Sequence, residues 1–537
     1  MARLNPTTPL LTAEAMREAD RYTMEDYGIP GFTLMESAGR GAAAAIRERY
    51  GPDLQGTSVV VLCGKGNNGG DGLVVARRLF AMGARIHVVL MSEAEALRDD
   101  PARNLSLLQH LHAHHPDAGR LTLRSFESLE RLDAATAPLA PDLYVDALLG
   151  TGLTSDLREP IRSVVDWLND RSAPVVALDV PSGLHSDTGR ILGDAVRAAC
   201  TLTMAAPKVG LRLGAGPVVA GSVEVVDIGI PSFVIDRVAK RPGCVRATTD
   251  AAVRAWWPAR APDAYKYSAG TVLVVGGAPS YTGAPVMAAK AAARSGAGYV
   301  MCACPASVQS ALAGSMTTIP TLGLPTTDAG TIDPGPALDA LADRLDTADA
   351  LLVGPGLGRA DPTARFVRTL LRETDLPTVI DADGLNALAG SIDDLTDHAD
   401  GRWLLTPHAG EFNRLAGSVD LDNRVRAADT YAARWNSTLL LKGRPSLVAQ
   451  PSGTTYAGST GTEALATAGT GDVLAGQCAA LLAQGVAPAK AAACALHLGG
   501  AAAERYDQQH DARTMVATDL LDMLPAAART CLESTDL

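Results

Sequence analysis

Short runs of consecutive apolar residues recur along the whole chain, separated by segments with helical character. In the first half these runs lie at 57–63, 86–91, 143–147, 175–180 and 223–227. Such runs, rich in β-branched residues, are typical of strands buried on both faces, and strands that alternate with helices form parallel sheets. The first half is therefore predicted to be an open, doubly wound α/β sheet.

The same pattern restarts in the second half, with apolar runs at 271–275, 350–353, 378–381, 403–406 and 438–441. Between the halves, residues 231–249 lose this rhythm and carry several basic residues, so we interpret them as a connection. A chain of 537 residues is too long for one ordinary core. We place the boundary near residue 243, which predicts two three-layer α/β domains at 1–242 and 243–537.

Composition narrows the classes of function. The net charge of −12 argues against nucleic acid as a partner, because such proteins need a basic surface. The eight cysteines are scattered without a CxxC pair, so we expect reduced, buried thiols in a cytoplasmic protein and neither a disulfide framework nor a zinc site. No signal peptide is apparent, and Lys490 and His497 interrupt the alanine-rich stretch around Cys494, which favours packed helices over a membrane span.

The loop after the first apolar run has the pattern Gly64-x-Gly66-x-x-Gly69, which matches the dinucleotide-binding fingerprint between a strand and a helix. Two asparagines and Asp71 add polar side chains where such a turn normally uses only backbone. They indicate a pocket for ribose, phosphate or a metal ion. The alternative is a simple Asn/Gly-rich turn, which these residues also favour.

Two further loops of the first half carry an acid at the end of a strand and a glycine turn after it, one beginning at Asp146 and the other at Asp179. Ligands of open α/β sheets bind outside the carboxyl ends of the strands, so all three loops are predicted to form one site. Asn68, Asp146 and Ser182 offer hard oxygen ligands, which suit an alkali or alkaline-earth cation. Each residue alone would more often be a cap or turn residue.

These loops, at 67–72, 146–152 and 179–183, resemble signature segments of NAD(P)H-hydrate epimerases, as does the segment 203–211. The resemblance covers about the first 235 residues and implies a Rossmann-like domain that interconverts the R and S hydrates of NADH or NADPH. It implies that Asp179 transfers a proton and that Asn68, Asp146 and Ser182 hold K⁺. It also implies that the hydrated dinucleotide contacts Asn67, Asn68, Gly69, Gly70, Asp71, Gly150, Thr151, Gly152, Leu153, Thr154, Ser155, Asp156 and Asp179.

In the second half, the stretch 466–476 places a Gly-Thr-Gly-Asp loop at the start of an apolar helix. Unpaired N–H groups at a helix start attract phosphate, and Asp472 could take a proton from a hydroxyl that is being phosphorylated. The alternative is that Asp472 only caps the helix. Lys442, at a strand end, could reach a phosphate or could be a solvated lysine, and His408, in a turn, could bind a ligand or be a core histidine.

The segments 282–285, 354–358, 381–383, 406–412 and 466–476 resemble, in order, ribokinase-like enzymes of the ADP-dependent NAD(P)H-hydrate dehydratase family, over roughly 250–510. The resemblance implies that Ala284, Gly356, His408 and Asp472 line the hydrate site and that Mg²⁺ accompanies ADP. It implies that Lys442, Gly443, Arg444, Pro445, Ser446 and Gly471 bind the nucleotide. The chain departs from the family at 461–463, where Gly-Thr-Glu replaces the usual Gly-Asn, and at Gly384, where alanine is commoner.

Taken together, the two resemblances imply a bifunctional isomerase and lyase that repairs NADHX and NADPHX, and we expect a homo-oligomer. Hydroxide is a poor leaving group, so phosphorylation of the hydroxyl from ADP would prepare its departure, with Asp472 as the base. Backbone amides at 469–471 would stabilise the transferred group. The alternatives are a ribokinase-like small-molecule kinase fused to a dinucleotide-binding regulatory module, an NAD-dependent dehydrogenase, or a non-catalytic binding protein.

Overall fold

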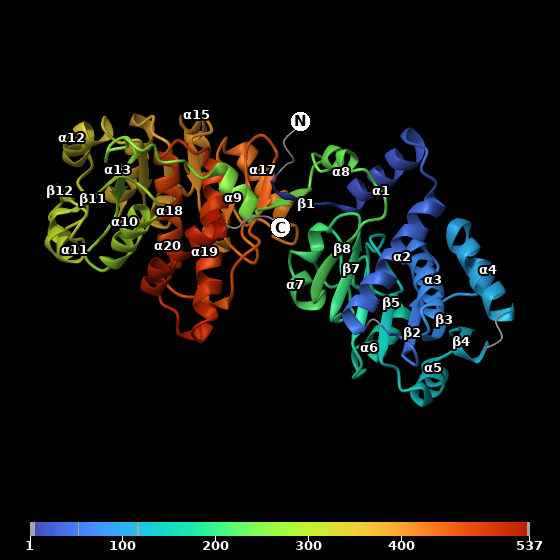
Figure 1. Ribbon diagram of the computed structural model, residues 1–537. Coiled ribbons are helices and arrows are strands. Elements are labelled where there is room, and N and C mark those ends of the chain that lie inside the picture. Colours follow the sequence, from blue (N-terminus) through green and yellow to red (C-terminus); the bar gives the residue numbers. More distant parts are fainter. Residues whose placement is uncertain (1–5, 52, 115–117, 534–537) are drawn as a thin grey trace. The chain divides into compact units, whose positions relative to one another are not determined.

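The computed structural model describes residues 6–51, 53–114 and 118–533 and divides into two compact units (Figure 1). The N-terminal unit is Pro9–Val245. Of the described residues, the C-terminal unit comprises 246–533 together with 6–8. Each unit is an α/β structure with helices on both faces of a central sheet.

The N-terminal unit is built on a seven-stranded sheet in which all neighbouring strands are parallel. Its order reverses between β2 and β5, as in a doubly wound sheet, so the predicted fold class is confirmed. β4 and β7 are absent from the predicted strands, because threonines interrupt their apolar runs. In spatial order the strands are β4 (Leu121–Ser125), β3 (Arg85–Leu90), β2 (Ser58–Cys63), β5 (Leu143–Ala147), β6 (Val175–Leu178), β7 (Cys200–Met204) and β8 (Ser222–Val226).

Alternate residues of β2 divide the core of this unit into two layers. Val59, Val61 and Cys63 pack into the larger cluster, together with α1 to α4 and α8, whereas Val60 and Leu62 pack with α5 and α6. A strand that is apolar on both faces requires helices on both sides, as observed. The helices are α1 (Ala13–Arg21), α2 (Gly31–Tyr50), α3 (Asn67–Ala81), α4 (Asp99–His114), α5 (Leu129–Thr136), α6 (Ile161–Asn169), α7 (Gly216–Val219) and α8 (Ser232–Val238).

The C-terminal unit is built on strands of an eleven-stranded sheet whose order reverses between β10 and β13, and β1, at one edge of it, contains the boundary residues Thr8 and Pro9. The strands from β12 to β16 are parallel, and β17 and β18 continue the sheet as an antiparallel hairpin. The predicted α/β class is confirmed here too. In spatial order the strands are β1 (Thr8–Leu10), β9 (Val245–Ala247), β18 (Thr455–Ala457), β17 (Leu447–Ala449), β16 (Thr438–Leu441), β15 (Trp403–Leu405), β14 (Thr378–Ile380), β13 (Ala350–Val353), β10 (Thr271–Val275), β11 (Tyr299–Pro305) and β12 (Thr321–Leu324).

Two helical layers cover this sheet. Val272 and Val274 of β10 pack with α9, α10, α11 and α18 to α20, while Leu273 and Val275 pack with α12 to α14, α16 and α17. The helices are α9 (Asp250–Trp256), α10 (Gly283–Arg294), α11 (Gln309–Ser315), α12 (Pro334–Leu345), α13 (Asp361–Glu373), α14 (Asp383–Leu388), α15 (Thr396–Ala399), α16 (Ala409–Ala416), α17 (Arg424–Arg434), α18 (Thr470–Ala483), α19 (Pro488–Asp507) and α20 (Ala517–Glu533).

Residues 231–249, interpreted from the sequence as a connection, are structured. Val234, Ile235 and Val238 of α8 are buried in the core of the N-terminal unit, and β9 follows. The two units divide within this segment, between Val245 and Arg246, but the interpretation from the sequence did not include its helix and strand. It missed α8 because the helix is only seven residues long and basic residues follow it.

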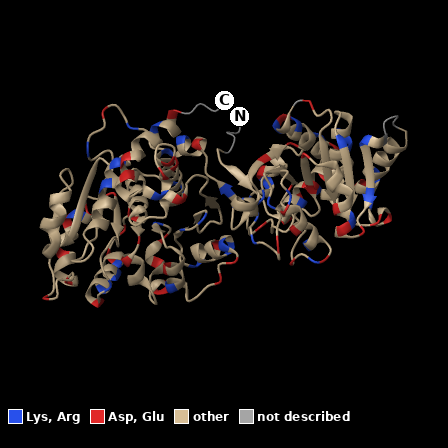
Figure 2. Ribbon diagram, turned by 90° about the horizontal axis from the view of Figure 1, so that it is seen from below, with Lys and Arg blue, Asp and Glu red and all other residues tan. Residues whose placement is uncertain are grey.

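The predicted burial of the cysteines is confirmed, since all eight are buried and free of disulfide bonds. Acidic and basic residues are interspersed along the helices and loops of each unit (Figure 2). Within the described ranges, no helix combines the length and apolar character that a membrane crossing requires.

Candidate functional site

The first loop cluster lies at the switch point of the N-terminal sheet, where the loops after β2 and β5 diverge. Asn67 and Asn68 lie in the first turn of α3, after Gly66 at its N-cap, so the alternative of a simple Asn/Gly-rich turn is wrong. The glycines of this loop permit close packing. A Cβ on Gly69 would lie 1.9 Å from the carbonyl oxygen of Gly64, which excludes any side chain there.

Asn68, Asp146 and Ser182, predicted as cation ligands, lie together. Ser182 donates from its hydroxyl to Asp146 Oδ1 at 2.7 Å and from its backbone N–H to Oδ2 at 2.8 Å. Asn68 Nδ2 donates to the carbonyl of Leu149 at 3.0 Å, which leaves the buried Oδ1 with no hydrogen-bond partner among the described residues. Burial raises the pKa of Asp146 to about 6, although the Ser182 bonds act against it.

Asp179 directly follows β6, and its main partner is Lys208. Lys208 is only 1% exposed, and its Nζ donates to Asp179 Oδ1, to Thr203 Oγ1 at 3.1 Å and to the Met204 carbonyl at 2.8 Å. The backbone N–H of Met204 also donates to Asp179 Oδ1, at 3.1 Å. All described hydrogen bonds of this carboxylate thus use Oδ1. The other oxygen, Oδ2, faces Gly150, and a Cβ added to Gly150 would lie 3.7 Å from it.

Two further carboxyl groups act on this pair. Burial and the neighbouring Asp179 and Asp20 carboxylates raise the pKa of Asp71 well above its ordinary value. Burial also raises the pKa of Asp20 to about 6, against the opposing effect of Lys208. Lys208 therefore acts electrostatically on three carboxyl groups, those of Asp20, Asp71 and Asp179.

The predicted substrate contacts in the loop 150–156 differ in their surroundings. Gly150 lies between the side chains of Asn68 and Asp179, since an added Cβ would meet both. Leu153 packs against the smaller core cluster of this unit. The remaining members of the loop are partly or fully exposed, and no described contact draws them toward Asp179: Thr151, Gly152, Thr154, Ser155 and Asp156.

The second loop cluster lies on the C-terminal sheet and is organised around the start of α18. Gly469 is the N-cap and has a φ of +92°, a conformation that favours glycine. Asp472 makes no capping hydrogen bond there, so the alternative of a helix cap is wrong. Burial and the carboxylate of Asp381 raise the pKa of Asp472 to about 7, with Lys442 acting in the opposite direction.

Lys442 follows β16 and points into this cluster. Its Nζ donates to Asp381 Oδ1 at 2.7 Å, and the same oxygen accepts from Thr406 Oγ1 at 2.7 Å. An added Cβ on Gly471 would lie 3.3 Å from Lys442 Nζ, so the lysine reaches the start of α18. Burial opposes its charge, yet the carboxylate of Asp381 raises its pKa. The alternative of a solvated lysine is wrong, because only 20% of the side chain is exposed.

His408 is the N-cap of α16. Its Nδ1 accepts from the backbone N–H of Gly410 at 3.0 Å, and Glu411 Oε2 accepts from the N–H of His408 at 3.0 Å, which completes a capping box. The side chain is 57% exposed, so the alternative of a core histidine is wrong. Since Nδ1 is the acceptor, Nε2 carries the proton of the neutral ring, and it lies 3.5 Å from Glu411 Oε1.

Gly356 and Ala284, both predicted to line the acceptor site, lie together. Gly356 has a φ of +63°, and an added Cβ would lie 2.8 Å from Tyr281 and 3.3 Å from the Ala284 side chain. Asp383 fixes the same loop, since its Oδ2 accepts from the backbone N–H of Gly358 at 2.9 Å. These loops follow β10, β13 and β14, which places them at the switch point of the sheet.

Hydrogen bonds from Arg424 of α17 fix the predicted nucleotide loop, Lys442 to Ser446. The guanidinium donates to the Pro445 carbonyl at 2.7 Å and to the Leu441 carbonyl at 3.2 Å. Ser446 Oγ accepts from the backbone N–H of Gly443 at 3.2 Å, which closes the loop on itself. In the divergent segment, Thr462 Oγ1 caps the short turn at Glu463–Leu465.

Sequence reasoning missed four residues of these clusters: Asp20, Lys208, Asp381 and Arg424. Lys208 and Asp381 lie inside the segments 203–211 and 381–383 used above. A charged residue next to an apolar strand is the feature by which each could have been recognised. Asp20 is on α1, more than 150 residues from Asp179, and no local pattern connects them.

Known proteins resemble the chain in both units. Residues 272–526 match the family model described as NAD(P)H-hydrate dehydratase, and residues 31–210 match that of the YjeF-related protein N-terminus. The bifunctional NAD(P)H-hydrate repair enzyme Nnr of Salinibacter ruber is 68% identical over 97% of this chain and 96% of its own. That of Moorella thermoacetica is 42% identical over 98% of each chain.

Among solved structures, the ADP/ATP-dependent NAD(P)H-hydrate dehydratase of Bacillus subtilis, co-crystallised with ATP/Mg²⁺, is 28% identical. It covers 53% of this chain and 98% of its own, with a TM-score of 0.44. The two family models and the full-length relatives agree with the resemblance inferred from the loops. The chain belongs to the family of bifunctional NAD(P)H-hydrate repair enzymes.

Proposed function

We propose that this protein repairs hydrated NADH and NADPH in two steps, with epimerisation in the N-terminal unit and ADP-dependent dehydration in the C-terminal unit. The observation that carries the proposal is that each unit gathers its own family's loops at the switch point of its sheet. The first site contains Asp179 with Lys208, and the second contains Asp472 with Lys442, so each unit has an acidic and a basic side chain for its own reaction.

Asp179 is the proton-transfer group proposed for the epimerase site. Lys208 and Met204 hold its Oδ1, which fixes the carboxylate and leaves Oδ2 directed at the loop of Gly150. The two hydrates differ in the configuration of the carbon that bears the hydroxyl, so one bond of this carbon must break and re-form on the opposite face. A carboxylate held in one orientation can give or take the proton that accompanies these two events. Lys208 acts through Asp179 as a positioning residue.

A potassium ion fits the residues proposed for it. The buried Asn68 Oδ1 lacks a partner among the described residues, and such an atom is costly unless a cation or water satisfies it. Asp146 and Ser182 add further hard oxygens beside it. A cation there would keep Asp146 ionised despite its burial and would hold the three loops in register.

In the C-terminal unit, Asp472 is the proposed base. A pKa of about 7 leaves much of this carboxylate ionised at neutral pH and able to take the proton of the substrate hydroxyl. The β-phosphoryl group of ADP would pass to that oxygen and leave AMP, and departure of phosphate with loss of a ring proton would restore NADH or NADPH. Gly471 N–H and Lys442 would stabilise the charge on the transferred group.

The remaining proposed contacts follow from this arrangement. Lys442 to Ser446 would hold the nucleotide, with Mg²⁺ on its phosphates, while Ala284, Gly356 and His408 would line the hydrate site. The protein would act on small molecules as a cytoplasmic homo-oligomer.

The test is a repair assay with mixed R and S hydrates, run separately with ADP and with ATP. Complete recovery of the reduced coenzyme with ADP, and release of AMP and phosphate in equal amounts, is expected. A stable phosphorylated product would instead favour a small-molecule kinase, and no reaction would refute the proposal.

A further inference from the structure

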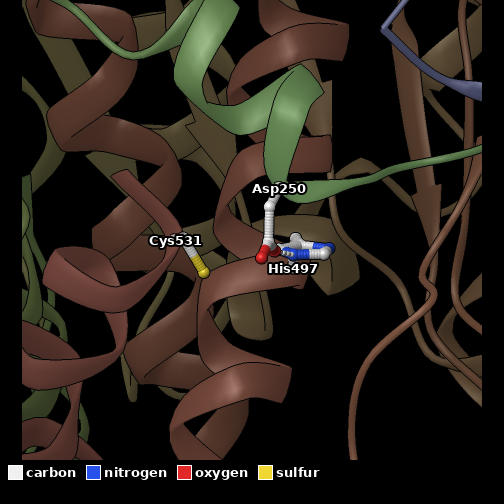
Figure 3. A group of neighbouring side chains, drawn as sticks. All are labelled: Asp250, His497 and Cys531. Carbon is white, nitrogen blue, oxygen red and sulfur yellow. Dashed lines mark hydrogen bonds and ion pairs between the residues drawn. The ribbon is translucent and has the colours of Figure 1, made fainter. Parts of the chain in front are cut away.

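Away from both loop clusters, three helices of the C-terminal unit bring together an aspartate, a histidine and a cysteine. Asp250 is the first residue of α9, His497 lies in the middle of α19, and Cys531 lies near the end of α20 (Figure 3). One ligand atom of each lies within 4.8 Å of the other two. Carboxylate, imidazole and thiolate are together the donor set of zinc-class ions.

The hydrogen bonds of His497 call for a cation at this place. Its Nδ1 lies 3.2 Å from Ser459 Oγ, and its Nε2 lies 2.6 Å from Asp250 Oδ1. Ser459 has a single hydroxyl proton, which it donates to the carbonyl of Thr248. Ser459 Oγ must therefore accept a hydrogen bond from Nδ1–H, so the neutral ring would direct the lone pair of Nε2 at a carboxylate.

That contact is unfavourable unless a positive charge lies between Nε2 and Asp250. The charge can be a proton, which makes the ring an imidazolium, or a metal ion. The His497 side chain is 4% exposed and Cys531 is 3% exposed, whereas the Asp250 side chain is 39% exposed. A shared proton needs no third group, whereas a metal ion does. The third group here is the Cys531 thiol, which hydrogen-bonds to the Asp250 side chain and whose Sγ lies within 4.8 Å of the other two ligand atoms.

We propose that Asp250, His497 and Cys531 bind a divalent zinc-class ion. Tetrahedral coordination at about 2.0–2.3 Å requires ligand atoms roughly 3.3–3.8 Å apart. The 2.6 Å contact between His497 Nε2 and Asp250 Oδ1 must therefore lengthen when the ion binds. The Asp250 side chain is 39% exposed and can adjust, and water can occupy the fourth position. Ser459 fixes the ring with its coordinating Nε2 toward the ion, as second-shell groups do.

The ion would join the first helix of the unit to its last two. It would also hold the segment before the Gly-Thr-Gly-Asp loop, because Thr460 Oγ1 donates to the carbonyl of His497 at 2.8 Å. Its role would therefore be structural. On metal binding, the thiol proton of Cys531 is released to solvent. No residue assigned to either proposed reaction takes part.

The test is titration of the full, untagged chain with Co²⁺, followed by its absorption spectrum, and with Zn²⁺, followed by metal analysis after dialysis. We expect one equivalent with a thiolate-to-cobalt charge-transfer band and the visible bands of tetrahedral cobalt. Cys531→Ala is expected to lose the band, whereas Cys302→Ala, a buried cysteine of β11, is expected to keep it. Ser459→Ala should bind about 10–100-fold more weakly.

The exposed histidines of α4 provide a control for surface binding. His110 and His114 stack one turn apart, with ring centroids 6.3 Å apart, and could also take up metal, but without a thiolate band. Changing both to alanine should leave the charge-transfer band intact. A Cys531→Ala protein with the wild-type spectrum, or a wild-type protein with no thiolate band, would overturn the proposal and leave a shared proton at His497.

Discussion

Removal of the Lys208 amino group is the perturbation whose effect the structure specifies best. In Lys208→Met the Asp179 carboxylate, 15% exposed, keeps its surroundings but loses its cation. Breaking a buried ion pair by removing one partner costs about 3–5 kcal/mol. The partial exposure of Asp179 favours the lower end of this range. We therefore expect the free energy of unfolding of this unit to fall by about 3 kcal/mol, which raises its equilibrium constant for opening roughly a hundredfold.

The assay is amide hydrogen exchange of the slowest amides in β7, in the full chain, for Lys208→Met, Asp179→Asn and the double variant. Both single changes leave an unpaired polar or charged group, whereas the double change removes the pair. The free energy of unfolding of the double variant should therefore fall by less than the sum of the two single decreases, with a difference of at least about 1 kcal/mol. Strictly additive losses, or a loss below about 1 kcal/mol in Lys208→Met, would refute the argument that the pair is coupled and buried.

Four further predictions concern the proposed sites. Asp472→Asn should lower the dehydration rate at least about a hundredfold and leave epimer exchange, followed by chromatography of the two hydrates, unchanged. Because Asp472 must be ionised and its pKa is about 7, kcat/KM for dehydration should rise about tenfold per pH unit below 7 and level off above it; a flat profile would contradict the assignment. Asn68→Ala, or replacement of K⁺ by choline, should slow epimerisation alone. Gly356→Ala should impair dehydration more than Gly358→Ala, since both have positive φ but only at 356 would the Cβ meet Tyr281 at 2.8 Å.

The raised pKa of Asp472 also has a stability consequence of definite sign. A carboxyl whose folded pKa lies above its unfolded value favours the folded state when protonated, so its contribution is lost as the pH rises from about 4 to 7. Asp472→Asn is thus expected to match the wild type in thermal stability at pH 4 and to exceed it at pH 8. A less stable variant at pH 8 would show that the carboxylate is compensated by contacts other than those described.

Much of the fold was predictable because fully buried parallel strands are continuous apolar runs. The predicted bounds of β10, β13 and β16 match the structure residue for residue. β7 escaped because its buried threonines, Thr201 and Thr203, make the run look polar, although their hydroxyls are hydrogen-bonded inside the sheet. α8 escaped because a short helix gives too little periodicity to recognise.

The loops of the sites were predictable because the carboxyl ends of parallel strands meet at one edge. What could not be predicted is which side chain each group meets. The capping role of His408 depends on the backbone of α16, and the pairing of Lys208 with Asp179 joins residues 29 positions apart through β7. The burial of Asp472 and the acids around it, which together raise its pKa, likewise depend on the sheet bringing distant loops together.

The central claim, that one chain carries both reactions, is tested most directly by the extent of recovery from an equal mixture of R and S hydrates with excess ADP. The measurement is made within a time too short for spontaneous epimer exchange. The wild type is expected to restore the whole pool and Asp179→Asn only the half that is already in the S form. Equal plateaus for the two proteins would contradict the role of Asp179, and a wild-type plateau at half would contradict the epimerase activity itself.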